Sequence, residues 1–211
     1  MQILEVARRK RHCYAVSTET EQVLLDVDIV EEYGLRPGVQ LSAAQLQALI
    51  IASNNRRALN KASFLLSRRD YAVKELLLKL IPDFGEDAAQ QAVDQLCDAG
   101  ALDDRKFAQF YASYLSETKK LAGRALVFEL TKKGIDRALA QEIAAELSSD
   151  PVASALEIVR RKYPDCLEDE RALRRLQGAL ARRGYGYDEI RSAVQAYREE
   201  QQADGKGEFD E

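Results

Sequence analysis

The sequence predicts a mainly α-helical protein, a tandem array of three three-helix units preceded by a small N-terminal β-hairpin or ribbon. Apolar residues recur at i, i+3, i+4 and i+7 after about residue 58, a period typical of amphipathic helices. Gly85, Gly134 and Gly184 can each end a helix, and they lie 49 and 50 residues apart. Such a fixed period indicates helical repeats, although any three helices with their loops also occupy about 50 residues.

Residues 1–50 follow a different pattern from the rest of the chain. Polar stretches that suit hairpin turns separate three β-prone runs, Ile3–Val6, Cys13–Ser17 and Val23–Val27. We expect Asp28 to begin a short helix that ends at Gly34, and Ser42 to cap the next helix. Because three strands alone are marginally stable, the ribbon is expected to pack on the helical body.

The first helical repeat is placed at residues 51–100. Leu65 and Leu66 belong to its opening helix, and the stripe of the second helix comprises Val73, Leu76, Leu77 and Leu80. We expect Pro82 and Gly85 to end that second helix. A third helix is predicted from Asp87 to Ala99, with one apolar face formed by Ala89, Val93 and Leu96.

The second repeat, residues 101–148, has the clearest pattern. Asp103 or Asp104 can cap a helix whose stripe another helix should cover, and that stripe is Phe107, Phe110, Tyr111 and Tyr114. The basic loop TKKLAGR leads into a second helix, which carries Leu126 and Leu130 on one face and ends at Gly134. The third helix has Leu139, Ile143 and Leu147 along one side.

The third repeat is placed at residues 149–198. Asp150 can cap its opening helix, with Pro151 at the first helical position, and Tyr163-Pro164-Asp165 breaks that helix. The two later helices carry apolar stripes, Leu173, Leu176 and Leu180 in one and Ile190, Val194 and Tyr197 in the other. Residues 199–211 lack periodicity, so we expect a disordered acidic tail.

The composition argues against several classes of protein. The net charge is −4, and the stretch from Arg198 to Glu211 alone contributes −4, so the remaining body is neutral with clustered cations. Such a body lacks the general positive field of a protein that coats DNA. Three widely separated cysteines and a single histidine predict no disulfide, metal or cofactor. There is no apolar run long enough for a membrane span and no secretory pattern, so we expect a cytoplasmic protein. We also expect a monomer.

Catalysis is not expected. The sequence contains no G-x-G-x-x-G or G-x-x-x-x-G-K-[ST] phosphate-binding pattern, no H-E-x-x-H motif and no histidine placed for a catalytic triad. Asp103 and Asp104 are adjacent carboxylates, but adjacent residues at a helix start point in different directions. Helix capping explains the pair better than acid–base chemistry does.

At the segments LDD, FAQFY, GRALVFELTKKGI and LARRGYGYDEI the sequence resembles the RecX family of recombinase regulators. The resemblance spans roughly residues 58–197 and extends to the EEYGLRPGVQL turn near the N-terminus. It implies an elongated all-helical crescent of three-helix units that binds along the groove of the RecA recombinase filament. Such a protein modulates, and usually restrains, the ATPase and strand exchange of the recombinase. A weak patch on each repeat could add up to firm attachment to a polymer.

Clustered basic residues are the candidates for contact with such a partner: Lys119, Lys120, Arg124, Lys132, Lys133, Arg160, Arg161, Lys162, Arg182 and Arg183. Cations in the last turn of a helix also stabilise its negative end by about 0.3–1 kcal/mol without any partner, so both explanations stay open. A second hypothesis is weak, direct binding of single- or double-stranded DNA through the same clusters. Such binding would fall steeply with salt.

Overall fold

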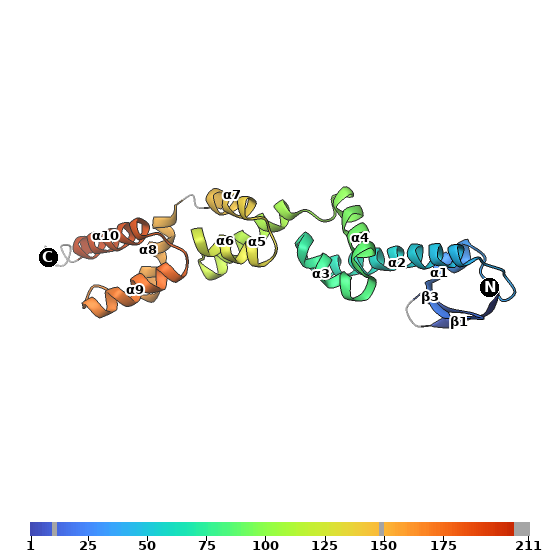
Figure 1. Ribbon diagram of the computed structural model, residues 1–211. Coiled ribbons are helices and arrows are strands. Elements are labelled where there is room, and N and C mark those ends of the chain that lie inside the picture. The colour runs from blue at the N-terminus through green and yellow to red at the C-terminus, as the bar shows by residue number, and fades with distance from the viewer. Residues whose placement is uncertain (10–11, 148–149, 205–211) are drawn as a thin grey trace. The chain divides into compact units, whose positions relative to one another are not determined.

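A computed structural model describes residues 1–9, 12–147 and 150–204 of the chain. Two compact units make up the chain, Met1–Asp103 and Asp104–Glu211 (Figure 1). In the described residues the fold is mainly α-helical with one three-stranded sheet, which confirms the predicted fold class.

The first unit begins with an antiparallel sheet in the order β1 (Ile3–Arg9), β2 (Cys13–Thr18) and β3 (Gln22–Asp26). The first two strands cover the predicted runs Ile3–Val6 and Cys13–Ser17, whereas β3 ends at Asp26, one residue before the predicted end of the third run, because Val27 begins the next helix. The following helix, α1 (Val27–Glu32), is capped by Asp26 rather than by the expected Asp28. The backbone N–H of Asp28 donates to Asp26 Oδ1 at 3.0 Å, because the strand ends in the extended conformation that an N-cap residue needs.

A hydrophobic core lies between the sheet, α1 and the first half of helix α2 (Ala43–Leu66), as expected for a ribbon that packs on helices. Its buried members are Ile3, Val16, Leu25, Ile29, Val30, Leu35 and Leu49. The backbone N–H of Asp26 also donates to the buried hydroxyl of Ser53 at 2.8 Å, which ties the end of β3 to α2.

Helix α2 is continuous for 24 residues, so the expected boundary between residues 50 and 51 falls inside it. Ser42 caps the helix as predicted, and Gln45 completes a reciprocal capping box. No proline or glycine interrupts residues 43–66, so nothing ends the helix where two separate helices were expected. Figure 1 shows α2 running from the sheet to the next helices of the same unit.

The second half of α2 packs with α3 (Val73–Phe84) and α4 (Glu86–Asp98) around another core. This core includes the predicted Leu76, Leu80, Ala89, Val93 and Leu96, together with Ala58 and Ala62 of α2. Pro82 does not end α3, which continues to Phe84. The proline lies in the last turn, where a missing N–H interrupts little of the helix.

The second unit contains two three-helix groups. One comprises α5 (Asp104–Lys119), α6 (Gly123–Lys132) and α7 (Arg137–Leu147). The other comprises α8 (Pro151–Lys162), α9 (Glu170–Arg182) and α10 (Tyr187–Asp204). We call them the middle and the C-terminal helical groups. The leucine stripe of α6 and the apolar stripe of α10 are buried, as predicted. In α9, Leu176 and Leu180 are buried, whereas Leu173 is only half-buried.

The predicted aromatic stripe of α5 is wrong in part. Phe107 is buried, but Phe110 is 68% exposed and Tyr114 is 48% exposed. The buried face instead consists of Phe107, Ala108, Ala112 and Leu115. Alanines allow a neighbouring helix to approach closely, and the bulky rings are left at the edge of the contact. In α7, likewise, Ile143 is buried with Ala140 and Ala144, whereas Leu139 and Leu147 are only half-buried.

The C-terminal boundary also differs from the prediction, because α10 continues to Asp204 where a disordered tail was expected from residue 199. Side-chain interactions support the extra turns. Gln195 donates to Glu199 at 2.8 Å, and Arg160 of α8 binds Glu200. The rest of the predicted tail, residues 205–211, lies outside the described residues.

Candidate partner-binding surface

The predicted basic loop forms the joint between the middle and C-terminal helical groups. It is shorter than expected, because α5 extends to Lys119 and α6 starts at Gly123. Lys120 adopts a left-handed backbone conformation, with φ of +53°. This turn directs the backbone N–H of Ala122 toward the carbonyl oxygen of Arg183, to which it donates at 2.9 Å.

Gly184 packs directly against this joint. A Cβ atom at this position would lie 2.0 Å from the carbonyl oxygen of Ala122 and 2.6 Å from the amide nitrogen of Ala125. Gly184 also has φ of +99°, a conformation that side chains disfavour. Glycine is therefore required at position 184 for two reasons: its positive φ, and the close contact between the two helical groups.

Five of the ten predicted cations are engaged within the chain. Lys120 Nζ lies 3.0 Å and Arg161 Nη1 lies 3.4 Å from carboxylate oxygens of Glu157. Arg160 Nε donates to Glu200 at 2.9 Å. Lys133 lies over the ring of Tyr111, and Arg183 Nη1 donates to the carbonyl oxygen of Ala179 at 2.9 Å.

These interactions also act on the carboxylates. The hydrogen bond from Lys120 lowers the pKa of Glu157 below its ordinary value, with smaller effects of the positive charges of Lys120 and Arg161. The hydrogen bond from Arg160 lowers the pKa of Glu200 in the same way. Lys120 and Glu157 belong to different helical groups, so their pairing supports the joint as well as neutralising a predicted contact residue.

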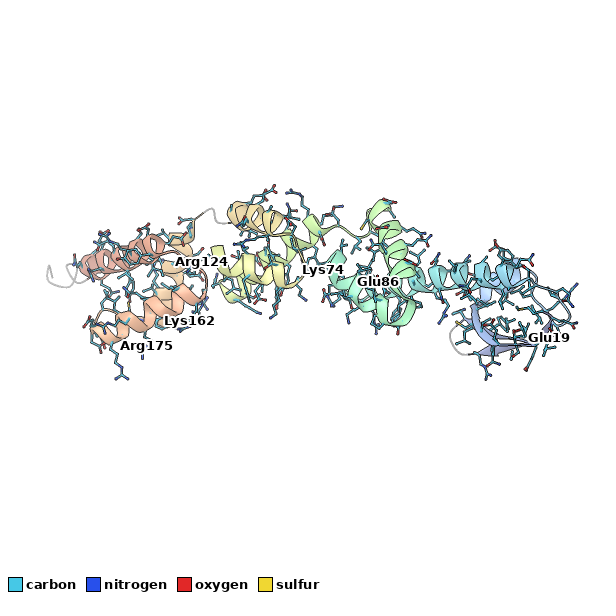
Figure 2. All side chains as sticks on the ribbon, in the orientation of Figure 1. Glu19, Lys74, Glu86, Arg124, Lys162 and Arg175 are labelled. Carbon is cyan, nitrogen blue, oxygen red and sulfur yellow. The ribbon has the colours of Figure 1, made fainter. Side chains whose placement is uncertain are left out.

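The other predicted cations are exposed: Lys119, Arg124, Lys132, Lys162 and Arg182. In the described part of the chain none of them forms an ion pair. Lys132, Lys162 and Arg182 lie in the last turns of their helices, where the helix dipole already favours a cation. Arg124 is different, since it stands at the start of α6 (Figure 2). It lines a cleft of the C-terminal helical group with a volume of about 700 Å³.

Three further arginines line the same cleft, and the sequence reasoning did not select them: Arg174 on α9, with Arg191 and Arg198 on α10. A signal for them exists in the sequence. Tyr187, Arg191 and Arg198 fall at i, i+4 and i+11 of one helix and so share a face. They were missed because only clusters of adjacent basic residues were considered.

The structure also exposes large apolar side chains that were expected to be buried or were not considered. In the second unit they are Phe110, Tyr114, Phe128 and Tyr187. Within the described residues, no group of three His, Cys, Asp or Glu side chains is arranged to hold a metal ion. Every helix of the described ranges is too short or too polar to cross a bilayer.

The class that this architecture defines is a helical-repeat protein, here with an arginine-lined cleft in its second unit. Comparison with known proteins identifies the family. Residues 103–143 match the model of the second three-helix domain of RecX, and residues 149–194 match that of the third. These ranges correspond closely to the middle and C-terminal helical groups.

Curated relatives extend the match. The chain is 35% identical over 133 residues to the regulatory protein RecX of Trichlorobacter lovleyi, covering 60% of this chain and 86% of that protein. It is 30% identical over 144 residues to the regulatory protein RecX of Chlorobium phaeobacteroides, covering 67% of this chain and 94% of that protein. The chain therefore belongs to the RecX family. A crystal structure of regulatory protein RecX shares the fold, with a TM-score of 0.68 at 16% identity over 92% of this chain and 98% of that chain.

Proposed function

We propose that this chain is a non-catalytic regulator that binds the RecA recombinase filament along its groove and restrains its ATPase, coprotease and strand-exchange activities. Its place would be in DNA repair, recombination and the SOS response, as a cytoplasmic monomer. Membership of a family whose relatives are named regulatory proteins is the observation that carries this proposal.

The geometry of the second unit supports a binding role. A backbone hydrogen bond and the Lys120–Glu157 pair join its two helical groups, so that contacts on both groups can act together. Binding of one chain to several subunits of a polymer needs such additive contacts. The exposed cations on both groups, Arg124 and Lys132 on one and Lys162 and Arg182 on the other, are available for acidic surfaces.

The test is to add the purified chain to recombinase filaments assembled on single-stranded DNA and to measure ATP hydrolysis and strand exchange. We expect both rates to fall at substoichiometric to stoichiometric amounts of the chain. A chain with Lys119, Arg124 and Lys162 changed to alanine should inhibit less. A matched control changes Lys74, Lys79 and Lys106, three other exposed lysines, to alanine. Unchanged rates with the unaltered chain would refute the proposal.

Direct DNA binding is the second candidate, and the exposed unpaired cations of the described residues favour it. Fluorescence anisotropy of labelled DNA without recombinase, at two salt concentrations, measures it. For duplex DNA the logarithm of affinity should fall with a slope of about −0.9 per phosphate contact. Since five predicted cations are engaged within the chain, we expect few contacts and weak binding.

A further inference from the structure

A groove with a partly apolar lining is formed by α9 and α10 of the C-terminal helical group, and Arg124 of α6 also lines it. Its lining includes Leu173 and Ala181 from α9, Tyr185 from the turn, and Ile190 and Val194 from α10. Small side chains on α9, at Gly178 and Ala181, leave room between the two helices. The cavity of about 700 Å³ is in the size range of pockets that hold several side chains of a ligand.

The groove is cationic. Arg124, Arg174, Arg191 and Arg198 line it, and the described residues that form its lining include no carboxylate. Arg191 and Arg198 are exposed and form no ion pair within the described ranges. Arg174 is paired with Glu170 one turn away, but both side chains are more than 70% exposed, so that pair is weak and can be exchanged.

This concentration of charge is local. On the other side of α10, Arg160 of α8 is matched by Glu200, and the joint matches Lys120 with Glu157. The lining of the groove brings together four guanidinium groups and contains no carboxylate. Guanidinium groups bind carboxylates and phosphates through paired hydrogen bonds, so the missing anions are expected from a ligand.

The apolar residues of the groove indicate whether the ligand supplies carboxylates or phosphates. Leu173 is half-buried, and Ile190 and Val194 retain 6% and 7% exposure; this aliphatic surface, mostly that of Leu173, suits an apolar side chain rather than a sugar–phosphate backbone. Tyr185 is 2% exposed, so its ring is not available for a base to stack on. Tyr187, which is 78% exposed, is the sole exposed ring among the described lining residues, whereas binding of single strands relies on several stacked bases.

We infer that this groove binds an acidic peptide segment, with one apolar side chain seated on this aliphatic surface and flanking carboxylates held by the arginines. The occupant is therefore an acidic, apolar-anchored stretch of a partner protein. The inference goes beyond the proposed function, because it depends on the lining of the groove and not on the identity of the recombinase.

The test is fluorescence anisotropy of a labelled 12-residue peptide made of Asp and Glu with one central leucine, titrated with the full chain at low salt. We expect saturable binding that weakens at least tenfold in Arg191→Ala/Arg198→Ala, since two charge-assisted contacts are lost. The matched control is Arg171→Ala/Arg175→Ala, which removes the same charge from exposed residues of α9 outside the lining. Figure 2 shows Arg175 projecting away from α9. We expect this control to bind within about twofold of the unaltered chain, as rim charges away from a contact do.

A second peptide with serine in place of the leucine tests the aliphatic surface, and it should bind several-fold more weakly. Equal loss in the two double variants, or equal binding of the two peptides, would overturn the inference. So would tighter binding of a thymidine oligonucleotide of the same charge that displaces the peptide. Circular dichroism must show unchanged helix content in both variants. If the chain binds the peptide but has no effect on the filament, the proposed function is refuted and the inference about the groove stands. If the chain inhibits the filament but does not bind the peptide, the inference about the groove is refuted and the proposed function stands.

Discussion

The middle and C-terminal helical groups end their second helix with the same glycine turn, but only in the C-terminal group does this turn also contact the other helical group. In each, a glycine with φ near +98° follows the second helix, and the next residue donates its N–H back to a buried leucine, Leu130 or Leu180. In the C-terminal group this corner also contacts the preceding helical group through Gly184 and Ala122. The same turn thus ends the second helix in both helical groups, and in the C-terminal group it also forms the contact with the middle group.

Gly184→Ala should have the largest effect on stability, because it disturbs both the end of the helix and the contact between the two helical groups. The new Cβ would overlap the carbonyl oxygen of Ala122 at 2.0 Å and take an unfavourable φ, so we expect a loss of more than about 4 kcal/mol in the free energy of unfolding. Gly134→Ala is the comparison, and its left-handed φ alone should cost about 1–2 kcal/mol. Urea unfolding followed by circular dichroism measures both. Equal losses would show that the joint adds nothing to the requirement for glycine.

Leu180→Ala and Leu130→Ala test whether the two cores are equivalent. Both leucines are fully buried, so each truncation should cost about 3 kcal/mol through lost burial and the cavity that remains. The same urea experiment applies, with the exposed Leu78 as a matched truncation that should change stability by less than about 0.5 kcal/mol. A difference of several kcal/mol between the two buried sites would contradict the comparison.

Tyr185→Phe probes the residue after the corner, where the middle group has Ile135. Since the middle group has an apolar residue at this position, loss of the Tyr185 hydroxyl should lower the free energy of unfolding by less than about 1 kcal/mol. Burial raises the pKa of the Tyr185 hydroxyl above its ordinary value. Burial also raises the pKa of Tyr197, so spectrophotometric titration should show tyrosines that ionise above the ordinary value, and the Tyr185→Phe substitution should remove one of them. An unchanged titration curve would contradict the burial of this ring.

Glu157→Gln should have the smallest effect. The hydrogen bond from Lys120 lowers the pKa of this carboxyl group, so its stabilising contribution is complete above the ordinary glutamate value of 4.5 and disappears as the pH falls through the lower folded value. We expect a slight fall in melting temperature at pH 7 that high salt reduces and that becomes smaller as the pH is lowered below 4.5. Glu142→Gln, which breaks a pair with Arg105 inside the middle group, is the control. A large drop for Glu157→Gln at pH 3 would contradict the electrostatic explanation.

Much of the fold follows from local chemistry that the sequence displays. Ser42, Asp150 and the glycine corners mark helix ends through their own hydrogen bonds, and most of the predicted leucines of α3, α6 and α9 are buried. The aromatic stripe of α5 failed because periodicity reports an apolar face but not its exact direction. Ala108 and Ala112 add little to a hydrophobic pattern because alanine is small, yet both are fully buried.

The candidate surface was predictable only in part, for a physical reason. Whether a cation is available depends on acids distant in the sequence: Glu157 lies 37 residues from Lys120, and Glu200 lies 40 residues from Arg160. The arginine groove likewise combines residues of three helices. Local charge counting could locate the clusters but could not show which of them the fold neutralises.

The shared helix α2 has a consequence for anyone who shortens this protein. Its first half is covered by the sheet and its second half by α3 and α4, so removing residues 1–41 would leave Leu46 and Leu49 facing water on an otherwise intact rod. Such a truncated chain would tend to self-associate, because these leucines would form an exposed apolar patch. A workable minimal version must either begin beyond Ser53 or replace those two leucines with polar residues.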